Sequence, residues 1–144
     1  MAESPCARRP DVRAVDTNIL ARYYLHDDAR QARVAGALLA AGDLFVPKTV
    51  VLELAWVLRS VAGQPAGKVA ACLGHLLALP GITVEDHEQI ESALRQYAAG
   101  IDFADAMHHA ASHACSEMLT FDDRGYARKA RRLGLKPAVR VPAA

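Results

Sequence analysis

The stretch Val-Arg-Ala-Val-Asp-Thr-Asn-Ile-Leu occupies residues 12–20, and it has the pattern of a strand that passes directly into a helix. Residues 12–15 form a short apolar run, and residues 18–25 continue as a helical one. Asp16 lies at the junction. In a doubly wound parallel sheet, ligand sites form beyond the carboxyl ends of the strands, where helices begin. This stretch therefore predicts an α/β fold with Asp16 at the edge of the sheet where ligands bind.

The rest of the chain repeats this alternation, which predicts a parallel sheet covered by helices. Further strands are expected at residues 44–46, 82–84, 118–121 and 138–141. Further helices are expected at residues 29–41 (with Asp28 as the cap), 49–62, 66–79, 86–99, 103–114 and 124–133. With no internal repeat or linker, residues 12–144 are predicted to form a single domain, and residues 1–11 a disordered leader.

The composition narrows the class of protein. A chain of 144 residues with 52% hydrophobic and 23% charged residues is typical of a soluble globular domain. It contains no apolar run long enough to span a bilayer and no secretory signal, so we expect no membrane association. Its three cysteines, Cys6, Cys72 and Cys115, are widely spaced, which favours reduced thiols in the cytoplasm. A Gly-rich phosphate loop and a G-x-S-x-G motif are both missing, which argues against a nucleotide-binding NTPase and a serine hydrolase.

Three more acids occur near predicted strand ends or helix starts. Glu53 is the only charge in the apolar helical run of residues 50–58, and burying an unpaired carboxylate costs several kcal/mol, so we expect it to need a cation. Asp105 lies in the first turn of a helix that Asp102 is expected to cap. Asp122 follows a strand. Asp16 also suits a helix cap, and that alternative stays open. Converging carboxylates repel one another unless a hard cation binds, and oxygen-only ligation suits Mg²⁺ or Mn²⁺.

Asp122 and Asp123 are adjacent and cannot point the same way, so we expect Asp122 to face the site and Asp123 to cap the next helix.

A zinc site is an alternative interpretation of the histidines. His109 and His113, with Asp105, have the spacing of one helix face, which would suit zinc. However, an H-E-x-x-H motif is missing, and a packed or half-exposed helix face explains the histidines equally well.

The end of the chain is basic. Residues 124–144 contain seven Lys or Arg residues and no acid, although the net charge of the whole chain is only +1. Arg124, Arg128 and Arg131 are the candidates for holding a polyanion's backbone. The alternative is a solvated helix face with basic residues near its C-terminus.

Four motifs together resemble the PIN-domain ribonucleases, and most closely the VapC toxins of bacterial toxin–antitoxin pairs. The motifs are Val-Asp-Thr-Asn-Ile-Leu at residues 15–20, Val-Leu-Glu-Leu-Ala-Trp-Val-Leu at 51–58, Asp-Phe-Ala-Asp-Ala at 102–106 and Leu-Thr-Phe-Asp at 119–122. The resemblance covers about residues 12–141. Its specificity comes from the order and spacing of all four motifs.

The resemblance implies a three-layer α/β/α fold with a central, mainly parallel sheet, and a Mg²⁺- or Mn²⁺-dependent endoribonuclease. It also implies a homodimer that a cognate antitoxin inhibits. Carried over by position, the acidic site comprises Asp16, Glu53, Asp105 and Asp122, with Asn18 and Thr120 as supporting polar residues. Asp102 and Asp123 are further possible contributors.

Two other functions remain open at this point. A Mg²⁺-dependent phosphatase or phosphoacceptor also uses acids at strand ends, but Asp16-Thr17-Asn18 lacks the second aspartate of a D-x-D motif. A module that binds RNA or protein without cleaving anything would have kept the fold and lost the chemistry. The presence of all four acids argues against such a loss.

Overall fold

The computed structural model describes residues 11–143, so the expected leader lies outside the described residues except for Asp11. The chain forms two compact units that divide between His87 and Glu88. The α/β class with parallel strands is confirmed. Within residues 11–143, no helix combines the length and the apolar character needed to cross a bilayer.

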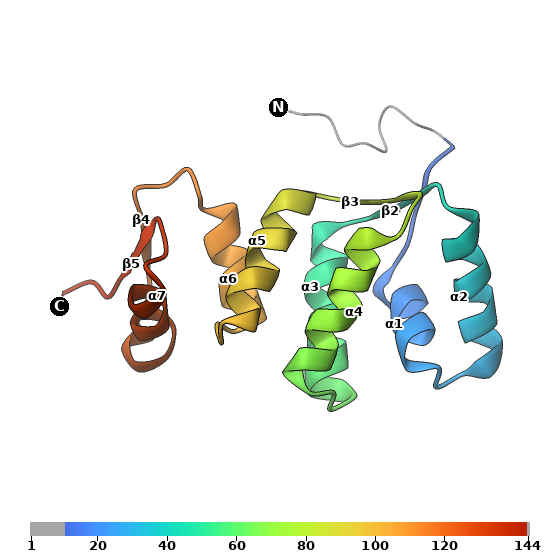
Figure 1. The fold of residues 1–144 in the computed structure, drawn as a ribbon, viewed down its shortest axis with the longest axis horizontal. Coiled ribbons are helices and arrows are strands. Elements are labelled where there is room, and N and C mark those ends of the chain that lie inside the picture. Colours follow the sequence, from blue (N-terminus) through green and yellow to red (C-terminus); the bar gives the residue numbers. More distant parts are fainter. Residues whose placement is uncertain (1–10, 144) are drawn as a thin grey trace. The chain divides into compact units, whose positions relative to one another are not determined.

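The first unit is built around three parallel strands in the order β1-β2-β3 (Figure 1). Its elements in chain order are β1 (Arg13–Ala14), α1 (Thr17–Leu25), α2 (Ala29–Ala41), β2 (Leu44–Val46), α3 (Lys48–Trp56), the π-helical segment η2 (Val57–Val61), α4 (Ala66–Ala78) and β3 (Ile82–Val84). All three residues of β2 are buried, because this strand lies between the other two. The helices contribute Leu20, Leu54 and Leu73 to the same core.

The starts of β2 and β3 come unusually close together. A Cβ atom added to Gly81 would lie 3.0 Å from the Cα of Gly42, and both glycines have positive φ angles, of 75° and 76°. A side chain at either position would therefore be strained or would push the strands apart. These glycines explain why the turns at residues 42–43 and 80–81 lead into adjacent strands.

The second unit contains three helices and two parallel strands. Its elements are α5 (His87–Ala98), α6 (Phe103–Ala111), β4 (Glu117–Leu119), the π-helical segment η3 (Asp123–Ala127), α7 (Arg128–Leu133) and β5 (Ala138–Arg140). Its core includes Ile90, Ile101, Phe103 and Val139. All five predicted strands and all seven predicted helices are present, with most ends within three residues of their predicted positions.

Two helices end differently from the prediction. The helix expected at residues 49–62 is α-helical only to Trp56, and it continues as the wider π-helical turn η2. The helix expected at residues 103–114 ends at Ala111, with Ser112 as its C-cap, because the Ser112 backbone N–H donates to the His109 carbonyl, three residues earlier, at 3.0 Å. Cysteines 72 and 115 are free thiols in the described part of the chain, and Cys6 lies outside it.

Candidate active site

Asp16 follows β1 at the carboxyl edge of the three-stranded sheet. Its side chain is exposed, and Oδ1 accepts a hydrogen bond from the Thr17 backbone N–H at 2.7 Å, so Asp16 is the N-cap of α1. Capping uses one carboxylate oxygen and leaves the lone pairs of the other. The expected cap and the expected site role are therefore compatible at this residue.

Two further acids, Glu85 and Asp86, follow β3 at the same edge, and unlike Asp16 both interact with Lys48. The Lys48 backbone N–H donates to Glu85 Oε1, and the Lys48 ammonium forms an ion pair with Asp86 Oδ2, both at 2.8 Å. These acids join the end of β3 to the start of α3. Within residues 11–143, Asp16 has no such cation partner, so its charge is open to a ligand.

Glu53 is exposed, so the expectation that it is buried was wrong. The apolar residues around it in the sequence lie on different faces of α3: Val51, Leu54 and Ala55 point into the core, whereas Thr49, Glu53 and Trp56 lie on the solvent side. The desolvation argument for a bound cation therefore fails. Glu53 forms no hydrogen bond or ion pair with the residues that the structure describes, which leaves its carboxylate available.

Asn18 is exposed one helical residue beyond the Asp16 cap. It lines a cleft of about 380 Å³ between α1 and α2, together with Ile19, Arg22, Arg30, Gln31 and Val34. Arg22 is held there by Asp27 and by Gln31, at 2.8 and 2.7 Å. The structure thus places Asn18 beside a basic cleft.

In the second unit, Asp102 is the predicted cap and Asp105 lies in the predicted first turn of the helix. Asp102 caps α6, with Oδ2 accepting from the backbone N–H groups of Ala104 and Asp105 at 3.1 and 3.3 Å. Asp105 is half-buried. Burial raises the pKa of its carboxyl, and the charges of Asp102 and Asp122 raise it further. These three carboxylates are therefore close enough to repel one another, and a cation beside Asp105 would relieve that repulsion.

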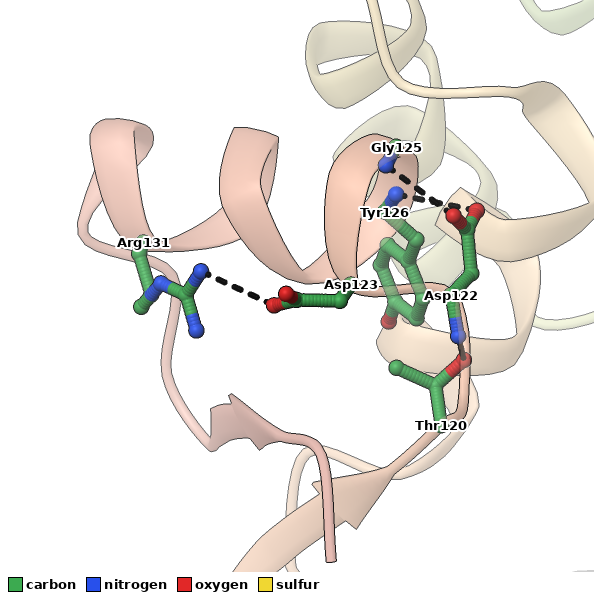
Figure 2. A network of polar contacts seen from close by, with 6 residues as sticks. All are labelled: Thr120, Asp122, Asp123, Gly125, Tyr126 and Arg131. Atoms are coloured by element: carbon green, nitrogen blue, oxygen red, sulfur yellow. Dashed lines mark hydrogen bonds and ion pairs between the residues drawn. The ribbon is translucent and has the colours of Figure 1, made fainter.

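Asp122 caps the next helical segment, whereas Asp123 was predicted to do so; this part of the prediction was wrong. Figure 2 shows the two side chains pointing apart: Asp122 accepts from the backbone N–H groups of Gly125 and Tyr126, both at 3.0 Å, and Asp123 pairs with Arg131 at 3.3 Å. These two backbone hydrogen bonds, with that of Tyr126 the larger cause, lower the pKa of Asp122. Each oxygen of Asp122 keeps a second lone pair for a cation.

The neighbours of Asp122 fix its position. The Thr120 hydroxyl accepts a hydrogen bond from the Asp122 backbone N–H at 3.1 Å, which gives this residue a local supporting contact (Figure 2). A Cβ atom on Gly125 would lie 2.7 Å from Asp122 Oδ2, so only glycine leaves room for the carboxylate in this position.

Tyr126 is a residue whose place the sequence did not predict. It is buried, its hydroxyl has no hydrogen-bond partner within residues 11–143, and burial together with the charge of Asp105 raises its pKa to about 12. Base stacking by Tyr126 is excluded by this burial. Phe103 is buried too and packs edge-on against Tyr97, with ring centroids 5.6 Å apart, as expected for a core residue.

The zinc alternative does not fit the histidines. His109 is buried, its Nε2 lies 2.8 Å from the Pro137 carbonyl oxygen, and its Nδ1 lies 3.1 Å from Gln96 Nε2. Because a carbonyl can only accept, Nε2 carries the proton and Nδ1 accepts from Gln96. Both ring nitrogens are thus used inside the core, and His113 lies beyond the end of α6.

The basic residues after Asp122 are not equivalent. Arg124 and Arg128 are exposed and form no ion pair with described residues, whereas Arg131 is already paired with Asp123. Lys129 donates to the Gly100 carbonyl oxygen at 3.0 Å, which ties α7 to the turn before α6. Arg124 and Arg128 are therefore the more available of the candidates for an anionic ligand.

The donor chemistry of the acids fits a hard cation. All four candidate ligands offer carboxylate oxygens, the type that Mg²⁺ and Mn²⁺ prefer. Asp16 and Glu53 belong to the first unit, and Asp105 and Asp122 to the second. Within neither unit, over residues 11–143, do three His, Cys, Asp or Glu side chains lie close enough together to hold a metal ion.

Comparison with known proteins gives one match. The sequence matches the family model of the PIN domain over residues 13–132, a range that includes all four candidate acids. No curated protein and no solved structure matches the chain.

Proposed function

Since the chain belongs to the PIN domain family, we propose that it is a Mg²⁺- or Mn²⁺-dependent endoribonuclease and the toxin of a toxin–antitoxin pair. PIN domains are generally metal-dependent nucleases, and the family suggests RNA as the ligand. The observation that supports the activity most directly is the half-buried Asp105, whose carboxyl pKa is raised by burial first and then by the charges of Asp102 and Asp122. Carboxylates in such an arrangement are costly to keep ionised without a cation.

In this proposal Asp16, Glu53, Asp105 and Asp122 hold the metal. The ion, when bound, lowers the pKa of a water molecule and neutralises charge on the scissile phosphate. The protein's part is to hold its ligands in place: Thr17 fixes Asp16, and the backbone of Gly125 and Tyr126 fixes Asp122. Asp102 holds the first turn of α6, which carries Asp105.

Hydrolysis by water leaves a 5′-phosphate and a 3′-hydroxyl, and it does not use the RNA 2′-hydroxyl as a nucleophile. Selection of RNA must then come from binding, and exposed single-stranded or loop nucleotides are the accessible targets. In this proposal Arg124 and Arg128 bind the phosphate backbone; both are exposed and form no ion pair with described residues.

A nuclease of cellular RNA must be blocked in its own host. We propose that a small cognate antitoxin does so, with an apolar helix on the protein's surface and an arginine against the carboxylates, because the planar guanidinium pairs bidentately with carboxylates. We further propose that the protein is a cytoplasmic homodimer and that residues 12–144 act as a single PIN domain. Co-expression with the product of an adjacent reading frame tests the antitoxin role: growth arrest on expression alone and its relief by the partner are expected.

One titration distinguishes the possible activities. Mg²⁺ or Mn²⁺ is added to the protein with a fluorogenic single-stranded RNA, and, in parallel, with a small phosphomonoester. Metal-dependent RNA cleavage with 5′-phosphate ends is the expected result. Release of phosphate alone would instead indicate a phosphatase, and RNA binding without cleavage at any metal concentration would indicate a catalytically silent module.

A further inference from the structure

Two aromatic side chains of this protein, Trp56 and Phe121, are largely exposed to solvent. The sequence has eight Phe, Trp and Tyr residues, all within the described part of the chain. Six of them are buried or half-buried, whereas Trp56 is 59% exposed and Phe121 is 86% exposed. An exposed aromatic ring forgoes the free energy that burial would give, so a binding partner can explain its exposure. The residues around the ring indicate whether that partner is another protein surface or a smaller ligand.

The two exposed rings have different surroundings. Phe121 follows exposed Leu119 by two residues, so it extends an apolar patch, and nothing in the structure shows what covers that patch. Trp56 lies instead on a mainly polar face of α3 and η2, where Thr49, Glu53, Arg59 and Ser60 are also exposed, together with one apolar side chain, Val61. A single exposed ring flanked mostly by polar groups is a poor surface for protein packing and a good surface for a planar ligand that keeps polar edges in water.

The position of Trp56 along the helix points to the ligand. Trp56 follows Glu53 by three residues on the exposed face, which is a rise of about 4.5 Å along an α-helix. Successive stacked nucleotides in one strand are about 3.4 Å apart. A ring at this spacing from a metal ligand can therefore contact a base within one or two nucleotides of the phosphate that the metal engages.

The next turn supplies a cation. Arg59 follows Trp56 by three residues and is exposed, and its only hydrogen bond within residues 11–143 is a long one, 3.3 Å, to the Gln64 carbonyl oxygen. The helix widens to its π-helical form immediately after Trp56, and such segments are frequent at functional sites. An aromatic ring followed by an arginine is the combination by which proteins bind single strands without reading their sequence.

We propose that Trp56 is a stacking platform for a base of single-stranded RNA beside the scissile phosphate, with Arg59 contacting the backbone next to that base. This inference rests on the proposed nuclease function and names a residue that binds its substrate. The ring stacks on any base, so it adds affinity and positions the strand without choosing a sequence.

The chain offers a direct readout, because Trp56 is its only tryptophan. Tryptophan emission is recorded while a mixed-sequence, 12-nucleotide single-stranded RNA is added to the Asp105→Asn variant in Mg²⁺, with a gel to show that the RNA stays intact. We expect water-like emission and iodide quenching in the free protein, and strong quenching by the RNA that saturates with binding.

Affinity measurements with labelled RNA separate stacking from general surface effects. Trp56→Ala should weaken binding by about tenfold or more, the range for one base–aromatic stack, whereas Trp56→Phe should stay within about threefold of the parent. Val61→Ala is the matched control, because Val61 is 64% exposed on the same helical continuation, and it should change affinity less than twofold. Unchanged melting temperatures would show that all three variants are folded.

Several outcomes would overturn the stacking role. They are an indole that RNA does not quench, equal losses in Trp56→Ala and Val61→Ala, and free-protein emission that shifts with protein concentration, which would place Trp56 between two copies of the chain. Parental RNA cleavage with an unquenched indole would refute stacking and leave the nuclease function standing. Quenching and the Trp56→Ala loss in a parent that cleaves no RNA would refute the nuclease function and support stacking.

Discussion

The carboxyl of Asp105 is destabilised as an anion by its surroundings. Burial is the main cause of its raised pKa, and the charges of Asp102 and Asp122 add to it. A raised pKa in the folded state means that ionised Asp105 favours unfolding. This cost is absent in acid, where the group is protonated in both states, and it grows as the pH rises from the ordinary carboxyl pKa past the raised one.

Asp105→Asn should therefore stabilise the metal-free protein at neutral pH. The gain should be no more than about 1 kcal/mol, because a half-buried group is screened by solvent, and it should vanish as the pH falls below about 4, near the ordinary aspartate pKa. Urea unfolding in EDTA across this pH range measures it. The same variant should lose more than nine-tenths of its metal-dependent RNA cleavage, while the exposed Glu88→Gln control keeps it. Cleavage retained in both Asp105→Asn and Asp16→Asn would exclude the proposed site.

Asp122 should show the opposite dependence on pH. Its pKa is lowered by the backbone hydrogen bonds, so its stabilising contribution is present above the ordinary carboxyl pKa and is lost as the pH falls through the lowered one. Asp122→Ala should melt at a lower temperature than the parent at pH 7, and at the same temperature in strong acid. Gly125→Ala should also lower the melting temperature, because its Cβ would displace the Asp122 carboxylate.

Asp123→Asn is the control. It removes only an exposed ion pair with Arg131, so it should lower the free energy of unfolding by less than about 1 kcal/mol. A larger loss of stability in Asp123→Asn than in Asp122→Ala would contradict the assignment of Asp122 as the cap.

Glu53 should matter for chemistry and not for stability. Because it is exposed and unpaired within the described residues, Glu53→Gln should change the free energy of unfolding by less than about 0.5 kcal/mol. Loss of its charge should weaken Mn²⁺ binding in a calorimetric titration, with Thr49→Ala on the same face as the control. Unchanged Mn²⁺ affinity in Glu53→Gln would remove Glu53 from the ligand set.

At the scale of the elements, local signals in the sequence located the helices and strands well. Asp28 and Asp102 cap the starts of their helices in the structure, as the sequence predicted. The two errors, in the end of α6 and in the burial of Glu53, have local causes that residue types alone do not reveal. The early end of α6 depends on the Ser112 backbone N–H, which donates to the carbonyl three residues earlier, and the exposure of Glu53 depends on which face of α3 meets the core.

His109 holds α6 to α5 and to the segment before β5, and this role is testable. His109→Ala would leave the Pro137 carbonyl and the Gln96 amide without their partner in the core, so we expect a loss of about 2–4 kcal/mol from unpaired polar groups and the lost ring. His113→Ala is the matched control, because His113 is exposed, and it should be neutral. Adding EDTA or Zn²⁺ should move the melting temperature of neither variant. Stabilisation by Zn²⁺ that depends on both histidines would restore the zinc interpretation.

At the scale of the whole molecule, the sequence predicted the α/β class, because strands and helices alternate along the chain. Parallel pairing follows from strands separated by helices, and all the described pairs are parallel. The strands are only two or three residues long, so their own pattern does not specify which strands pair.

The basic residues near the end of the chain attract RNA phosphates, whereas the carboxylates repel them. The salt dependence of RNA binding measures the contribution of the basic residues. Arg124 and Arg128 are exposed and unpaired within the described residues, so reversing both charges should weaken RNA binding. The double reversal should also reduce the slope of log affinity against log salt by about 1.4, because each of two lost phosphate contacts on a single strand contributes roughly 0.7. Arg131→Glu should have a smaller effect, because Asp123 already holds that guanidinium, and Arg33→Glu on α2 should have none.

An antitoxin that contacts the carboxylates should bind the variant with Arg124 and Arg128 reversed within a few-fold of the parent. Loss of antitoxin binding with unchanged RNA cleavage would instead assign the basic segment to the antitoxin and require another path for the RNA.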